Sequence, residues 1–182
     1  FGAIPGGRLV AMAAHDKVLT QGTGNPGPFL WLQKGKYGLA SLCFFLEAGK
    51  IVAAIQMAWW LTSSHEASLV AGVLAIFAHG HSPFLRWIPC RSSAVYLGFA
   101  FGLYWGAGGA LSGILLFTIL FFLWQNKGQY QACNDALLIL LLALPAVLFF
   151  LMGTNPALAG MVICVYGLWH HKRQILIMRN FS

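Results

Sequence analysis

Charged side chains are scarce in this chain of 182 residues. Asp, Glu, Lys and Arg make up 8% of the sequence, and only 4 residues are acidic. Soluble domains usually contain about 25% charged residues, so an ordinary soluble domain is excluded. The apolar content of 59% instead predicts an all-α integral membrane protein, with residues 1–182 forming a single domain.

Paired cysteine motifs are also missing. The 4 cysteines, at positions 43, 90, 133 and 164, share no paired spacing. Cys43 and Cys164 fall inside apolar runs, whereas Cys90 and Cys133 fall in connections that we place in the reducing cytoplasm below. We therefore expect no disulfide, no metal site and no cofactor held by cysteine. A signal peptide and low-complexity segments are not visible either.

Long apolar runs dominate the sequence. They predict about seven transmembrane helices, at residues 1–14, 37–61, 66–87, 93–107, 109–125, 136–152 and 155–170. The first run is too short to cross a bilayer, so we expect a truncated first helix and further residues before Phe1.

The basic residues fall on one side of this map. Ten of the 11 Lys and Arg lie around the first run or after the odd-numbered runs, and the connections after the second, fourth and sixth runs have none. The positive-inside rule then places the odd-numbered connections and the C-terminus in the cytoplasm. The net charge of +7 is spread over these short connections, so we interpret it as affinity for anionic headgroups or substrates and expect no nucleic-acid partner.

Tryptophan and glycine positions add two expectations. The tryptophans lie near the predicted interfaces, the inner one marked by Trp31, Trp87, Trp124 and Trp169 and the outer one by Trp59, Trp60 and Trp105. Gly98, Gly102 and Gly106 repeat every four residues and predict close helix approach, either within this chain or against another protein.

The longest connection, residues 15–36, is rich in glycine. Gly22, Gly24 and Gly27 surround Asn25, and such a loop can direct backbone N–H groups toward an anion. Thr23 adds a hydroxyl, and Lys34 and Lys36 add charge. From the residues alone, a plain connector stays open as the alternative.

Glu47 and Lys50 are ionisable residues inside an apolar run. They are three positions apart and share one face of a helix, so we predict a structural ion pair facing the bundle interior. His79 and His81 are two positions apart and point to different sides of a helix. We interpret His81 as a polar group at the cytoplasmic end of its helix, and a metal or haem site at these residues stays open as the less favoured alternative.

Several short motifs follow one another along the chain. They are Gly2-Ala3-Ile4-Pro5, then Gly22-Thr23-Gly24-Asn25-Pro26-Gly27, Glu47-Ala48-Gly49-Lys50, Gly80-His81-Ser82-Pro83-Phe84, and His171-Lys172-Arg173-Gln174-Ile175. In this order the chain resembles the bacterial acyl-phosphate:glycerol-3-phosphate acyltransferases, the PlsY family, which typically shows GSIP, GSGNPGATN, D-x-x-KG, GHxFP, a GGKG loop and HRENI. The pairing of G-x-G-N-P-G with a preceding G-x-I-P is the specific part, and the resemblance covers essentially the whole chain.

The chain departs from the family pattern at several positions. Pro28-Phe29-Leu30 replaces the family's ATN, and Gln33 stands where an Arg is expected. Arg91 stands near the GGKG lysine without its glycines. Asn134 replaces a serine, and Arg173 and Gln174 replace the Glu and Asn of HRENI.

The resemblance implies transfer of an acyl group from acyl phosphate to a hydroxyl of glycerol 3-phosphate, as in phospholipid synthesis in the bacterial inner membrane. It implies Thr23, Arg91 and His171 as catalytic residues, and as substrate-binding residues Gly22, Gly24, Asn25, Gly27, Lys36, Asn134 and Gln174. Membrane lipids and these two substrates are the expected partners. A second interpretation stays open because of the departures: a non-catalytic subunit with the same fold in a larger respiratory or photosynthetic membrane complex.

Overall fold

The computed structural model describes residues 2–15, 27–85, 92–104 and 129–179, together with positions 106, 111, 114 and 118. From residue 170 onward only the backbone of the last helix is described. Every regular element within these ranges is helical: α1 (Gly6–Ala13), α2 (Pro28–Gln33), α3 (Tyr37–Thr62), α4 (His65–Gly80), the 3₁₀ turn η2 (Pro83–Leu85), α5 (Ser93–Leu103), α7 (Gln129–Met152) and α8 (Thr154–Arg179). The all-α prediction is confirmed for this part of the chain.

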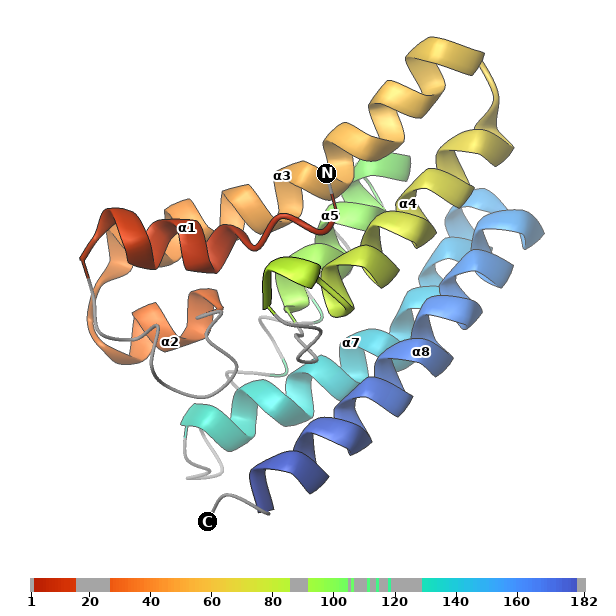
Figure 1. Ribbon diagram of the computed structural model, residues 1–182. Coiled ribbons are helices and arrows are strands. Elements are labelled where there is room, and N and C mark those ends of the chain that lie inside the picture. The colour runs from red at the N-terminus through yellow and green to blue at the C-terminus, as the bar shows by residue number, and fades with distance from the viewer. Residues whose placement is uncertain are drawn as a thin grey trace.

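The helices form two groups that pack together (Figure 1). In the first group α3 contacts α1, α2, α4 and α5, and in the second α7 and α8 run antiparallel side by side. Contacts of α4 with α8 and of α5 with α7 join the groups. Ile51, Phe99, Leu144 and Ile163 belong to the main core between them. A smaller core, with Val10, Trp31 and Cys43, lies where α1 and α2 cover the start of α3.

Two helical stretches are long and apolar enough to cross a bilayer, Tyr37–Thr62 and His65–Leu85. Shorter apolar helices are Ser93–Leu103, Leu138–Met152 and Thr154–Trp169. Large apolar side chains lie exposed on these helices, including Phe45, Trp60, Leu74, Phe150 and Val165. So much exposed apolar surface is typical of a protein whose solvent is lipid. About seven spans stays a prediction, because most of the run at 109–125 is outside the described residues.

The helix ends differ from the predicted span ends for local reasons. The run at 66–87 ends its α-helix at Gly80, because Pro83 cannot continue a helix and starts the 3₁₀ turn. The run at 93–107 ends at Leu103, where Tyr104 is extended. Hydropathy marks a lipid boundary and not a helix end, so α7 begins before position 136 and α8 continues past position 170.

The N-terminal quarter agrees with the expected short first helix, adds a helix in the connection that follows it, and places Trp31 differently. The first run contains a helix of only 8 residues, α1, and the connection 15–36 contains α2, which Pro28 starts at its first turn. Trp31 is 0% exposed and packs inside the protein, so it is not an interfacial residue facing lipid. Because α1 and α2 cover the start of α3, the indole fills the space beneath them.

Gly98 shows where the glycine repeat is used. A Cβ at Gly98 would lie 2.5 Å from the carbonyl oxygen of Ala48, and one at Gly102 would lie 2.7 Å from Ile55. The repeat therefore brings α5 against α3 within this chain, as the first of the two predicted uses required. Cys43 and Cys164 are buried free thiols.

Candidate functional site: a buried ion cluster where the motifs meet

Glu47 lies on the face of α3 that is covered by α1 and α4. Its side chain is 1% exposed. One carboxylate oxygen, Oε1, accepts a hydrogen bond from the backbone N–H of Gly7 at 3.1 Å. The other, Oε2, lies 2.6 Å from Nζ of Lys50. A carboxylate at this depth needs such compensation, because burying an unpaired charge is very costly.

The ammonium group of Lys50 has an acceptor for each of its three N–H donors. These are Oε2 of Glu47 at 2.6 Å, the backbone oxygen of Ile4 at 2.6 Å and Nδ1 of His79 at 2.9 Å. Because an ammonium only donates, we assign Nδ1 as the acceptor in this contact and the ring proton to Nε2. Nδ1 of His79 and Oε2 of Glu47 are then two acceptors that face the same ammonium and lie 3.2 Å apart. We call Glu47, Lys50 and His79 the ion cluster.

The ion cluster fixes the N-terminal segment against α3 and α4. Ile4 and Gly7 are bound as described, and Oγ of Ser82 donates to the backbone oxygen of Ala3 at 2.5 Å. Arg8 also links α1 to the segment after α4, since its Nη1 donates to the backbone oxygen of Phe84 at 2.6 Å. Three of the motifs singled out in the sequence, those at residues 2–5, 47–50 and 80–84, therefore meet in space.

A fourth segment reaches the same end of α4. Nδ1 of His81, the residue that caps α4, lies 2.9 Å from Oη of Tyr166 on α8. The ring of Tyr166 also packs on Phe77, with 4.0 Å between centroids, and Trp169 stacks near His81 at 6.2 Å. His171 follows Tyr166 by five residues, which is about 7.5 Å along the helix axis. The last turns of α8 thus begin beside the end of α4.

The described cations at this end lie on α1 and around α2. Lys34 caps the end of α2, and Lys36 precedes α3 with its Nζ 5.7 Å from the centre of the Trp31 ring. Both lysines are exposed. Glu47 is already paired with Lys50, and Lys34, Lys36 and Arg8 place further cationic groups at this end.

The residues predicted from the family motifs are placed to different extents. Thr23, Gly22, Gly24, Asn25 and Arg91 lie outside the described residues. Gly27 and Lys36 are described and stand before α2 and α3. For Asn134 in α7 and His171 and Gln174 in α8 only the backbone helix is described. The start of α7 and the end of α8 lie at the same end of their antiparallel pair (Figure 1).

His79 and Tyr166 were missed by the sequence reasoning. A signal for His79 existed, because Glu47 uses only one of the three donors of Lys50. The remaining donors required acceptors from another segment, and His79 is a polar residue within the next apolar run. Nothing local in the sequence distinguishes Tyr166 from the other aromatic residues of α8.

Composition and fold thus describe a helical protein, consistent with a membrane protein, whose distant polar motifs meet at one end of the bundle. Comparison with known proteins refines this class. The family described as Glycerol-3-phosphate acyltransferase matches residues 1–180. The chain therefore belongs to the glycerol-3-phosphate acyltransferase family, and the resemblance inferred from the motifs is confirmed.

Individual relatives are similar over nearly their whole length. A glycerol-3-phosphate acyltransferase of Rhodopseudomonas palustris (strain HaA2) is 28% identical over 178 residues, covering 96% of this chain and 85% of that protein. One of Paramagnetospirillum magneticum is 27% identical over 177 residues, covering 97% and 84%. One of Prochlorococcus marinus (strain NATL1A) is 25% identical over 182 residues, covering 97% and 88%. No solved structure matches the chain.

Proposed function

We propose that this protein transfers a fatty acyl group from acyl phosphate to a hydroxyl of glycerol 3-phosphate and releases lysophosphatidate and inorganic phosphate. The observation that carries the proposal is the meeting of the family's motif segments at one end of the helices, around the ion cluster. The names of the relatives supply the acceptor.

The reaction needs little covalent chemistry from the protein. The acceptor hydroxyl attacks the carbonyl carbon, the bond from that carbon to the phosphate oxygen breaks, and the hydroxyl proton ends on the released phosphate. Acyl phosphate is already activated, so no enzyme nucleophile is required. The protein contributes alignment of the two substrates and stabilisation of the negative charge that develops on the carbonyl oxygen.

Charge at the proposed site suits two phosphate-bearing substrates. Arg8, Lys34 and Lys36 are the described cations at this end. We add Arg91, Lys172 and Arg173 to these cations, because the sequence predicts that they lie on the same, cytoplasmic side of the membrane. In this proposal Arg91 binds phosphate, the hydroxyl of Thr23 donates a hydrogen bond, and His171 makes a polar contact with the substrates.

The ion cluster has a supporting role in this proposal. Its three side chains contact one another and the backbone of residues 4–7. They hold the start of α1, and α1 leads directly into the glycine-rich segment that contains Thr23 and Asn25. The cluster thereby sets where that segment begins relative to α4 and α8.

The membrane setting is part of the same proposal. Seven spans with a cytoplasmic C-terminus would place the ion-cluster end of α3 toward the cytoplasm of a bacterium, within its inner membrane. The exposed apolar side chains of α3, α4, α7 and α8 support a lipid environment on the outside of the bundle. The acyl chain of the donor can approach from that lipid while both phosphates stay in water.

A reconstituted assay tests the proposed function. The purified protein in lipid vesicles receives acyl phosphate and glycerol 3-phosphate, and lysophosphatidate is quantified by mass spectrometry. Arg91→Ala and Thr23→Ala should each lower the rate about ten- to hundredfold, because losing a hydrogen bond to a charged group costs about 1.5–3 kcal/mol. Lys127→Ala is the matched control, since it removes a cation from a connection on the same side and should leave the rate within about twofold.

Two results would contradict the assignment. Absence of product from the folded, unmutated protein would remove the catalytic proposal and favour a structural subunit. Equal rates for Arg91→Ala and Lys127→Ala would leave the activity but remove the assigned phosphate contact. Restoring the family residues with Phe29→Thr and Leu30→Asn should raise the rate of an enzyme whose pocket is weakened, and should change nothing in a protein without a pocket.

A further inference from the structure

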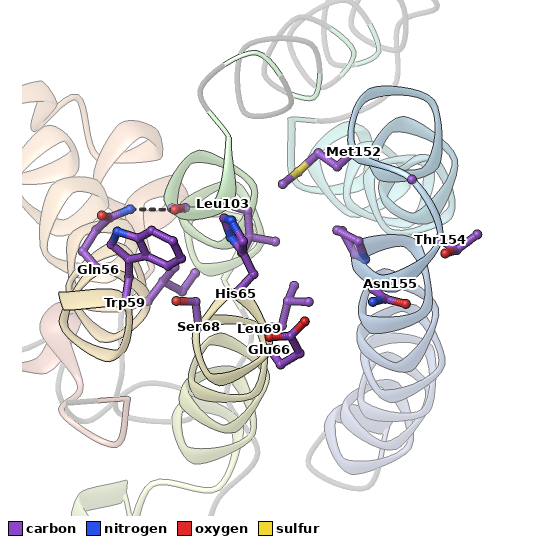
Figure 2. Close-up of a pocket in the computed structure, with 14 residues that line it drawn as sticks. Gln56, Trp59, His65, Glu66, Ser68, Leu69, Leu103, Met152, Thr154 and Asn155 are labelled. Carbon is purple, nitrogen blue, oxygen red and sulfur yellow. Dashed lines mark hydrogen bonds between the residues drawn. The ribbon is translucent and has the colours of Figure 1, made fainter. Parts of the chain in front are cut away.

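A pocket of about 660 Å³ opens at the opposite end of the helices from the ion cluster. Figure 2 shows its place between the turn that joins α3 to α4, the end of α5, and the turn that joins α7 to α8. Trp59 on its wall follows Glu47 by twelve residues on α3, which is about 18 Å along the axis. The pocket is therefore separate from the proposed acyl-transfer site.

The pocket combines an apolar floor with an aromatic wall. Ile55, Leu69 and Leu103 supply apolar lining. The rings of Trp59 and His65 pack face to face with a tilt of 33° and 4.4 Å between their centroids. Gln56 is held in place because its Nε2 donates to the backbone oxygen of Gly102 at 2.8 Å. The Gln56 side chain thus joins the α3 side of the pocket to the end of α5.

Glu66 supplies the charge of the lining. Among the described residues that line the pocket there is no Lys or Arg, although the chain has a net charge of +7. Oε2 of Glu66 accepts a hydrogen bond from Oγ of Ser64 at 2.8 Å, and the carboxylate is exposed. In Figure 2 the Glu66 side chain lies on the same side of the pocket as Trp59 and His65, and Met152 and Asn155 lie across the pocket, beside the α7–α8 turn.

The helix ends around the pocket do not offset this negative charge. Among the described helices, α3, α5 and α7 end here and α4 and α8 begin here. Helix C-termini carry partial negative charge and N-termini partial positive charge. The described helix ends therefore add no net positive charge that would offset Glu66.

We propose that this pocket binds an alkylammonium group. The cation would lie against the part of the Trp59 ring that His65 leaves exposed, and near the Glu66 carboxylate, with its methylene groups over the apolar floor. Such a group is carried by the headgroup of an ethanolamine phospholipid and also by free amines. The protein would then take up an amine lipid at the membrane face opposite the proposed acyl-transfer site.

Native mass spectrometry of the purified protein tests the binding. The protein is exposed to equal amounts of phosphatidylethanolamine and phosphatidylglycerol, and retained lipid is counted for each variant. The unmutated protein should retain the ethanolamine lipid about tenfold better, since a charge-assisted contact is worth roughly that factor. Glu66→Gln and Trp59→Leu should each remove most of this preference. Both residues are at least partly exposed, so these variants should fold.

Trp60→Leu is the matched control. Trp60 neighbours Trp59 but is 79% exposed and does not line the pocket, so its loss should leave the preference unchanged. A second arm measures the thermal midpoint in phosphatidylglycerol with added ethanolamine or tetramethylammonium. A rise that Glu66→Gln abolishes, without lipid preference, would support the same site with a free amine as its source. No preference and no rise in the unmutated protein, or effects that persist in both pocket variants, would overturn the proposal.

Discussion

Replacing Lys50 by Met should be among the most damaging single substitutions in this protein. Met keeps the length and apolar stem of the side chain but removes the ammonium. Glu47 then remains 1% exposed without its ammonium partner, facing the Gly7 N–H and Nδ1 of His79, and the backbone oxygen of Ile4 loses its donor.

The magnitude follows from the burial of the pair. Removing one member of a buried ion pair costs about 3–5 kcal/mol, because the other charge stays behind uncompensated. Lys50 has an 8% exposed side chain and Glu47 is less exposed still, so solvent screens the pair weakly. We expect a loss of about 3–5 kcal/mol for Lys50→Met. The double variant with Glu47→Gln removes both charges and should lose only about 1–2 kcal/mol.

Unfolding by sodium dodecyl sulfate in mixed micelles, followed by helical circular dichroism, measures these free energies of unfolding. Arg8→Met is the matched control, since it removes an exposed cation whose Nη1 donates to the Phe84 oxygen, and it should cost less than about 1.5 kcal/mol. The decisive sign is that the double variant is more stable than Lys50→Met alone. If adding Glu47→Gln to Lys50→Met lowers stability further, the ion cluster is not the coupled unit argued above.

Two further predictions concern packing and topology. Gly98→Ala should cost about 1–3 kcal/mol in the same unfolding assay, because its methyl group would meet the backbone of α3. Gly49→Ala is the control, since the new methyl group has open space around it and the variant should be neutral or slightly more stable. Similar losses for both variants would refute the close approach of α5 and α3. Cysteines placed at Ser64 and Lys36 should react with an impermeant thiol reagent from opposite sides of the membrane, and labelling from one side would refute the proposed topology.

Composition and hydropathy predicted much of the helical pattern. The run at 37–61 corresponds to α3 almost residue for residue, and Ser63, with a positive φ of 50°, makes the turn into α4. The Glu47 and Lys50 side chains do lie in contact within the bundle, as their three-residue spacing indicated. These features depend on local sequence, so local reasoning reaches them.

Features that depend on contacts between distant segments could not be read in the same way. Trp31 was expected at the lipid interface because tryptophan favours that position, but the cover of α1 and α2 buries it. The third acceptor of the Lys50 ammonium, His79, comes from another helix 29 positions away. His65 gave no signal at all, since its pairing with Trp59 depends on the geometry of the α3–α4 turn.

For the candidate site, too, the sequence predicted the local motifs but not the contacts between distant segments. The order of the motifs predicted the family, which the match over residues 1–180 confirms. The meeting of the segments at residues 2–8, 47–50 and 79–84 became visible only with the hydrogen bonds of the N-terminal segment. The roles of Thr23, Arg91 and His171 stay predictions from the motifs.

Product formation by the unmutated protein tests the central claim most directly. The protein is reconstituted in lipid, its helical fold is verified by circular dichroism, and acyl phosphate and glycerol 3-phosphate are supplied together and singly. We predict lysophosphatidate and an equal amount of inorganic phosphate when both substrates are present, and no lysophosphatidate when either is omitted. A folded protein that forms no lysophosphatidate with both substrates present would contradict the account.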